Sequence, residues 1–238
     1  EDPIEITHSG LRQVQMNARI GWTFAAAMRT FLRADPDVIM IGEMRDEETA
    51  RIAIEASLTG HLVLSTLHTN SAPESIARLL EIGLDPFNFS DSLLAILAQR
   101  LVRRLCTQCR EPHAAHHDTL QAMASQYLES SAANSAEARD ALIARWRKAY
   151  GKDDGSITLW RRQGCPQCES HGYKGRMGIH ELMLSDEPIR QHIRHRSSAT
   201  EIRLSALAAG MKTLRQDGIE KVLQGLTDMS EVTAATNL

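Results

Sequence analysis

Two stretches of the chain carry apolar runs that predict buried strands. The first is VIMI within residues 37–42, which has no polar alternation, and the second lies in HLVLSTLH, at 61–67. A strand without polar alternation is typical of a parallel sheet that helices cover on both faces. Between the two, EETARIAIEASL has helical spacing and follows Asp46, a good N-cap residue. Strand, helix and strand in this order predict an α/β fold with parallel strands.

Helices are predicted on both sides of this unit. Thr23 precedes the helical pattern FAAAMRTFLRA, which Pro36 ends, and Pro73 stands in the first turn of ESIARLLEIG. Residues 86–105 predict one long helix with a basic last turn. Before these helices, Gly10 and the alternation in LRQVQMN predict a hairpin or a short strand.

The composition changes after residue 105. Residues 111–156 are rich in Ala, Ser, His and Glu around AEARDALIARWRKAY, which predicts a helical insertion. A short strand, RMGIHELML, follows it. Three amphipathic helices are predicted to complete the chain, at 186–195, 199–209 and about 212–224.

Two polar side chains come directly after the two predicted strands. Glu43 follows the first and His68 the second, and neighbouring parallel strands place such residues at one edge of the sheet, where ligands of α/β folds bind. A solvated acid paired with Arg45 or Arg51, and a structural histidine, are the alternative interpretations.

Further candidates for a phosphate or magnesium site lie upstream. Glu1, Asp2 and Glu5 surround a proline turn; they either solvate a loop or join Glu43 at the same edge, where carboxylates would suit hydrated Mg²⁺. Arg29 and Arg33 are four apart on a predicted helix face.

These arginines are either surface charge or forks for phosphate oxygens. Nothing in their spacing decides between the two.

The four cysteines form two C-x-x-C pairs. Cys106 and Cys109 make the first pair and Cys165 and Cys168 the second, and two such turns complete a tetrahedral sulfur shell that is closed and therefore structural. This pattern favours Zn²⁺ over disulfides or a redox pair.

Charge and hydropathy narrow the class of protein. The 238 residues contain 27 Lys and Arg and 30 Asp and Glu, a net charge of -3 that gives no reason to expect nucleic acid as a partner. Without a run of 18 apolar residues or a basic and apolar leader, the chain is expected in the cytoplasm. Because EDPIEI reads like the end of a strand, we expect the chain to be a fragment.

Taken together, the motifs resemble one family, the secretion ATPases of type II secretion and type IV pilus systems. EDPIE is similar to its aspartate box, RADPDVIMIGEMRD to an atypical Walker B motif with Gly in place of Asp, and TGHLVLSTLHTN to its histidine box. AQRLVRRLCTQC, CPQC and GYKGRMGIHELM resemble the stretch that holds a tetracysteine zinc site in secretion and assembly members.

The resemblance implies a RecA-like parallel sheet flanked by helices, a tetracysteine zinc subdomain and a C-terminal helical bundle. It implies ATP hydrolysis with Mg²⁺ in a homo-hexameric ring that works with the platform and anchoring proteins of the inner membrane. The chain then divides into a partial ATPase core at 1–105, a zinc-binding subdomain with the insertion at 106–175, and a strand plus helical subdomain at 176–238.

The resemblance also implies roles for single residues. Glu43 would position Mg²⁺ and its water, either Glu1 or Asp2 would orient or deprotonate the attacking water, and His68 would sense the γ-phosphate. Arg29 and Arg33 would reach across subunits to the nucleotide.

One motif of the family has no counterpart here. No G-x-x-x-x-G-K-[ST] loop occurs in residues 1–238, so the chain by itself is expected to bind ATP poorly and to hydrolyse almost none. Within the family, the four cysteines favour a secretion or assembly motor over a retraction motor, and EASLTGHLVLSTLHTNSAPESIARLLEIGLDPF resembles the type II secretion branch most. A type IV pilus assembly ATPase, a non-catalytic zinc-containing docking module and a DNA motor are the alternatives, the last disfavoured by the net charge.

Overall fold

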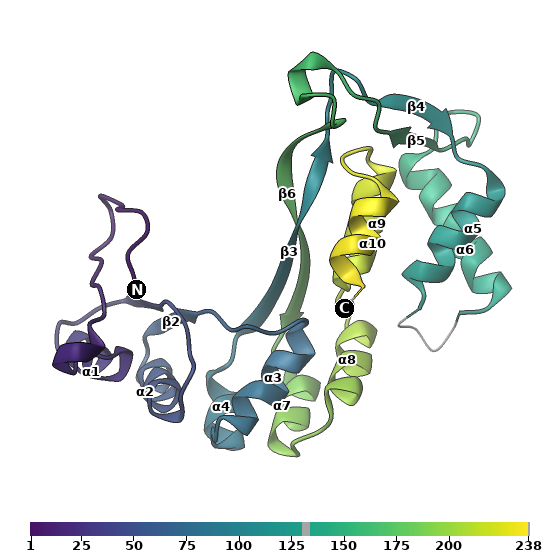
Figure 1. The fold of residues 1–238 in the computed structure, drawn as a ribbon. Helices are drawn as coiled ribbons and strands as arrows, with labels where there is room; N and C mark the ends of the chain where they lie inside the picture. The colour runs from purple at the N-terminus through teal and green to yellow at the C-terminus, as the bar shows by residue number, and fades with distance from the viewer. Residues whose placement is uncertain (130–133, 238) are drawn as a thin grey trace. The chain divides into compact units, whose positions relative to one another are not determined.

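A computed structural model describes residues 1–129 and 134–237, which form two compact units (Figure 1). The first unit comprises Glu1–Ile96 and Leu184–Arg203, and the second comprises Leu97–Met183 and Leu204–Leu238. Each unit combines segments that are far apart in the sequence, because segments from the C-terminal part of the chain complete both of them.

A parallel βαβ unit forms the centre of the first unit. Strands β1 (Val38–Ile41) and β2 (Leu62–Ser65) pair in parallel, with Ile41 opposite Ser65, and α2 (Glu47–Leu58) connects them. Asp46 caps α2, since its Oδ1 accepts a hydrogen bond of 2.8 Å from the Thr49 amide. The predicted α/β fold with parallel strands is confirmed.

The prediction that the first strand is buried on both faces is wrong. Ile39 and Ile41 are 4% and 2% exposed, but Val38 and Met40 are 55% and 65% exposed. Only one face is covered, by residues of α1 (Phe24–Phe31) and α2 such as Met28 and Ile52. On the same strand pair, Leu62 and Leu64 are also exposed, so an apolar face remains open in the described part of the chain.

Other elements of the first unit follow the sequence signals closely. Thr23 caps α1 by accepting from the Ala26 amide, and Ser71 caps α3 (Ala72–Glu81), in whose first turn Pro73 stands. The hairpin or strand predicted before Asn17 is not there; Asn17 makes an isolated bridge with Trp22 instead. The remaining elements are the short helix η1 (Ala18–Ile20), α4 (Pro86–Ser92) and α7 (Glu187–Arg194).

The long helix predicted over 86–105 is also wrong. The helix α4 ends at Ser92, and Ala95–Leu105 form the strand β3, which pairs with β6 (Tyr173–Leu184). The better-covered positions of β3, Ile96 to Val102, alternate with exposed ones at a period of two. Pairing with β6 therefore outweighs the helical propensity of the Ala, Leu, Gln and Arg residues here, which is only a weak preference.

Helices and a small antiparallel sheet build most of the second unit. Strands β4 (Glu111–Ala114) and β5 (Thr158–Arg161) pair in antiparallel register. The insertion between them is helical as predicted, with α5 (His117–Tyr127) and α6 (Ala136–Tyr150) side by side in Figure 1. Residues 130–133 of the insertion lie outside the described residues.

The core of the second unit joins this insertion to the C-terminal helices. Leu120, Trp146, Ile219 and Val232 are each at most 4% exposed and belong to one apolar cluster. The three helices predicted after 184 correspond to α7, α8 (Ala199–Ala208) and α9 (Leu214–Leu223), and a further helix, α10 (Met229–Thr236), was not predicted.

A buried carboxylate attaches α10 to β3. Glu231, whose side chain is 11% exposed, accepts a hydrogen bond of 2.9 Å from the Arg103 amide and one of 2.5 Å from its guanidinium. The hydrogen bond from the Arg103 side chain outweighs burial and lowers the pKa of Glu231 below its ordinary value of 4.5.

We expect Glu231→Gln to lower the free energy of unfolding by about 1 to 3 kcal/mol at pH 7, because it removes a charge-assisted pair. A carboxyl group with a lowered pKa in the folded state stabilises above its unfolded pKa. The difference between the variant and the unchanged protein should therefore shrink as the pH falls below 4.5. Urea titrations at pH 7 and pH 3.5 measure it, with the exposed pair member Glu129→Gln as control. An equal difference at both pH values would contradict this account.

Candidate functional site

The ends of the two parallel strands bring an acid and a histidine together. Glu43 follows β1 by two residues, His68 follows β2 by three, and Glu43 Oε2 lies 3.4 Å from His68 Nε2. The Glu43 side chain is 16% exposed and that of His68 84%, so the carboxylate is sheltered while the imidazole faces solvent. This edge of the sheet, with Glu43 and His68, is called the strand-end site below.

Glu43 also has the neighbour that the alternative interpretation named. Arg45 Nε lies 2.5 Å from the same carboxylate oxygen, Oε2. The Arg45 side chain is 73% exposed, and a pair of this kind contributes little to stability in water. Glu43 Oε2 thus has two nitrogen atoms nearby, Arg45 Nε and His68 Nε2.

Thr66 holds the two strand ends in place. Its hydroxyl donates a hydrogen bond of 2.5 Å to the Gly42 carbonyl, and its own carbonyl accepts one of 3.2 Å from the Met44 amide. The two bonds fix the backbone at Gly42 and at Met44, the residues directly before and after Glu43. They continue the parallel pairing beyond Ile41 and Ser65, where the named strands end.

Sequence analysis did not single out Thr66. The available signal was a hydroxyl residue near the end of the strand predicted at 61–67, two positions before His68. A hydroxyl group can donate a hydrogen bond to the backbone of a neighbouring strand. Its partner here, the Gly42 carbonyl, is 24 positions away, and only the strand register identifies it.

The N-terminal residues come close to the strand-end site through their backbone. A Cβ added to Gly42 would meet the Glu1 Cα at 3.6 Å, so Glu1 lies against the residue before Glu43. Glu1 is held there by main-chain bonds from its amino group to the Val14 carbonyl and from the Met16 amide to its own carbonyl, both 2.9 Å.

The carboxylates of this segment are placed differently. Glu1 Oε1 accepts a hydrogen bond of 2.8 Å from Nε2 of the Gln13 side chain, and both Asp2 and Glu5 are exposed. The strand that EDPIEI was expected to end is absent from the described residues, in which 1–5 have no regular structure.

The two arginines singled out in the sequence do not share a helix face. Arg29 lies on α1 and forms an ion pair with Glu48 at the start of α2, with both side chains about half exposed. Helix α1 ends at Phe31, so Arg33 lies in the following turn and is exposed. The expectation of one arginine face is wrong because the helix is shorter than its apolar pattern.

The four cysteines do gather as predicted. Their Sγ atoms all lie within 4.8 Å of one another, and all four are free thiols. Cys106 and Cys165 are 4.0 Å apart, and Cys168 is 3.8 Å from both Cys109 and Cys165. The edge of a tetrahedral zinc–sulfur shell is about 3.8 Å, given a zinc–sulfur bond of about 2.3 Å, so the four sulfurs fit a metal of this size.

Backbone amides support negative charge on the sulfurs. Cys168 Sγ accepts from the amides of Cys165 and Gly172, and Cys109 Sγ accepts from that of Gly164, at 3.2 to 3.3 Å. Burial opposes ionisation of Cys168, but the amides of Cys165 and Gly172, together with hydrogen bonds from the side chains of Cys109 and Cys165, outweigh it and lower the pKa of Cys168 to about 7. At Cys109 burial outweighs the Gly164 amide and raises the pKa to about 12.

Gly172 is required for this arrangement. Its φ is +75°, and a Cβ there would lie 2.6 Å from the Arg162 Cβ.

Comparison with solved structures defines the class of fold. The chain is similar to the crystal structure of the pilus retraction motor PilT with bound ADP, with a TM-score of 0.61 and 24% sequence identity over 98% of this chain and 50% of that one. The ATPase DotB of Legionella pneumophila is similar in the same way, with a TM-score of 0.57 and 20% identity over 98% of this chain and 49% of that one. The fold is therefore shared with a pilus retraction motor and with an ATPase.

Sequence comparison then gives the family. The chain belongs to the Type II/IV secretion system protein family, whose sequence model matches residues 1–234. The Type IV pilus assembly ATPase PilB of Thermus thermophilus is 46% identical over 236 residues, which are 99% of this chain and 24% of that protein. The Type II secretion system protein E of Pseudomonas aeruginosa is 46% identical over 237 residues, which are 99% of this chain and 42% of that protein.

The resemblance inferred from the motifs is thus confirmed at the level of the family. The chain spans less than half the length of these relatives.

Proposed function

We propose that this chain is part of the ATP-hydrolysing subunit of a type II secretion motor. The observation that carries the proposal is the 3.4 Å approach of Glu43 and His68 at the ends of two parallel strands, the edge at which α/β folds bind their ligands. The relatives named as ATPases of secretion and pilus assembly support it.

The geometry suggests how the strand-end site acts in the full-length protein. Glu43 is a sheltered carboxylate and suits the binding of hydrated Mg²⁺ or of the attacking water. His68 lies within reach of Glu43 on an exposed loop, so contact with the γ-phosphate can change its position without disturbing the strands. Glu1 or Asp2 remains the proposed partner that orients the water, and Arg29 and Arg33 the proposed contacts across subunits.

The larger assembly is proposed from the family. We infer a homo-hexameric ring on the cytoplasmic side of the inner membrane, working with platform and anchoring proteins, with no role for nucleic acid. Among the described residues no helix is long and apolar enough to cross a membrane. A type IV pilus assembly ATPase is the second candidate, because PilB is as similar to this chain as the type II secretion proteins are.

Zinc is the metal that we propose for the cysteine cluster. The sulfur-to-sulfur distances and the amide donors suit a tetrathiolate site, in which Zn²⁺ would join the turn after β3 to the turn before β6. Such a closed site is structural and takes no part in hydrolysis.

The first prediction of this proposal concerns Glu43. In the full-length protein, Glu43→Gln should reduce ATP turnover by about a hundredfold to ten-thousandfold, because it removes the charge that positions the metal or the water. Glu55→Gln is the matched control, since Glu55 is an exposed acid on α2 paired with Arg51. A loss below about threefold for Glu43→Gln would remove this residue from the site and favour the docking-module alternative.

The second prediction concerns Thr66. Thr66→Val removes the hydroxyl bond to Gly42 with little change of shape and should lower turnover by about tenfold, whereas Thr66→Ser keeps the donor and should stay within about twofold. In a Glu43→Gln background Thr66→Val should add little, because both act on one group. Equal effects of Val and Ser, or full additivity, would show that Thr66 does not act through Glu43.

The third prediction concerns the metal. Elemental analysis of the purified protein should find about one zinc per chain, and Cys165→Ser should lose it. His171→Ala is the control, because His171 lies three residues after Cys168 but outside the sulfur cluster, and it should keep the metal. Absence of zinc with four reactive thiols would contradict the assignment.

A further inference from the structure

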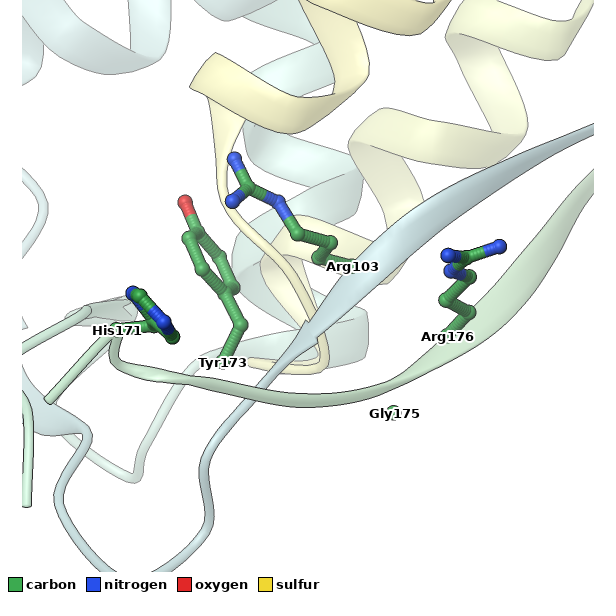
Figure 2. Close-up of a pocket in the computed structure, with 5 residues that line it drawn as sticks. All are labelled: Arg103, His171, Tyr173, Gly175 and Arg176. Carbon is green, nitrogen blue, oxygen red and sulfur yellow. The ribbon is translucent and has the colours of Figure 1, made fainter. Parts of the chain in front are cut away.

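A cavity lies in the second unit, and none of its lining residues belongs to the strand-end site. It has a volume of about 280 Å³ and is lined by Arg103, His171, Tyr173, Gly175 and Arg176, which we call the arginine pocket. Figure 2 shows the side chains of Arg103, Tyr173 and Arg176 projecting to the same side of strands β3 and β6.

The backbone of β6 is distorted where it forms this pocket. Tyr173 and Arg176 are three positions apart, and a regular strand would place them on opposite faces. Gly175, between them, has a φ of +78°, and the two side chains line one cavity. A local distortion of this kind re-aims side chains, and such distortions are frequent next to functional sites.

Arg176 has no carboxylate to neutralise it. Its side chain forms no ion pair or hydrogen bond with any residue in 1–129 or 134–237. The surrounding strand segments, 97–110 and 170–178, contain arginines and a lysine but no Asp or Glu. An exposed guanidinium in a cavity, with only positive neighbours along the chain, is poised for an anion from outside.

Arg103 is partly committed but keeps donors for a ligand. Its Nη2 donates to Glu231, and its guanidinium lies 4.3 Å from the centre of the Tyr173 ring, which orients it. The other nearby acid, Asp228, accepts the Tyr173 hydroxyl at 2.7 Å. Both nearby acids, Glu231 and Asp228, therefore already have partners, and neither forms an ion pair with Arg176.

We propose that the arginine pocket binds a phosphate oxyanion between the guanidinium groups of Arg103 and Arg176. Arginine forks match phosphate and carboxylate oxygens. The two guanidinium groups come from different strands, and a tetrahedral phosphate has enough oxygen atoms to accept hydrogen bonds from both of them. A planar carboxylate, by contrast, is fully used by a single guanidinium fork. This site is independent of the proposed ATP hydrolysis, since none of its residues belongs to the strand-end site.

The experiment titrates the zinc-loaded protein with inorganic phosphate at low ionic strength and follows arginine side-chain Nε–Hε signals by NMR. Signals of Arg103 and Arg176 should shift together and saturate. Arg176→Ala should weaken binding by about tenfold or more, and Arg176→Lys, which keeps the charge but not the fork, should also weaken it. Arg104→Ala is the matched control, since Arg104 is an exposed neighbour of Arg103 that does not line the pocket, and it should change binding less than twofold.

The outcomes separate the possibilities. Saturation with acetate but not with phosphate would overturn the assignment in favour of a carboxylate, such as an acidic side chain of a partner. Equal losses for Arg104→Ala and Arg176→Ala, or no saturation by phosphate, would show a diffuse positive field and no site. Gly175→Ala gives a second test: if it keeps its melting temperature, it should still weaken binding because the φ of +78° is strained for alanine.

Discussion

The register of one short parallel strand pair determines where Glu43 and His68 lie. Pairing of Val38 with Leu62 through Ile41 with Ser65 brings the two loops after the strands side by side. A shift of one residue would move Glu43 away from His68 and turn Ile39 and Ile41 out of the apolar cluster that α1 and α2 cover. Packing of the core and geometry of the strand-end site are thus fixed by the same interaction.

The second unit obtains its cohesion from polar contacts as much as from apolar ones. Besides the helical cluster around Trp146, Arg110 stacks over Trp160 at 4.2 Å and donates to the carbonyl of Gly225. A Cβ on Gly225 would lie 2.3 Å from the Trp160 ring, so position 225, in the turn before α10, has to be glycine. The cysteine cluster and this stacked arginine hold segments that have little apolar surface of their own.

The sequence allowed the βαβ unit, the caps at Thr23 and Asp46 and the cysteine cluster to be predicted, because each depends on local pattern or on residue chemistry. It did not allow β3 to be predicted, because the alternation in Ala95–Leu105 is masked by strong helix formers and becomes decisive only when β6 pairs with it. The same holds for Thr66 and for Arg176, whose roles follow from partners or backbone angles that no short window of sequence contains. The proximity of Glu43 and His68 was predictable only after the strands were assumed to be neighbours.

The open apolar face of β1 and β2 has a consequence for handling the protein. Val38, Met40, Leu62 and Leu64 project from adjacent strands on one side and are between 42% and 65% exposed. A contiguous patch of large aliphatic side chains drives self-association in concentrated solution. Preparations of these 238 residues alone will therefore need low concentration or mild detergent, so that light scattering measures the size of the dispersed protein and not that of aggregates.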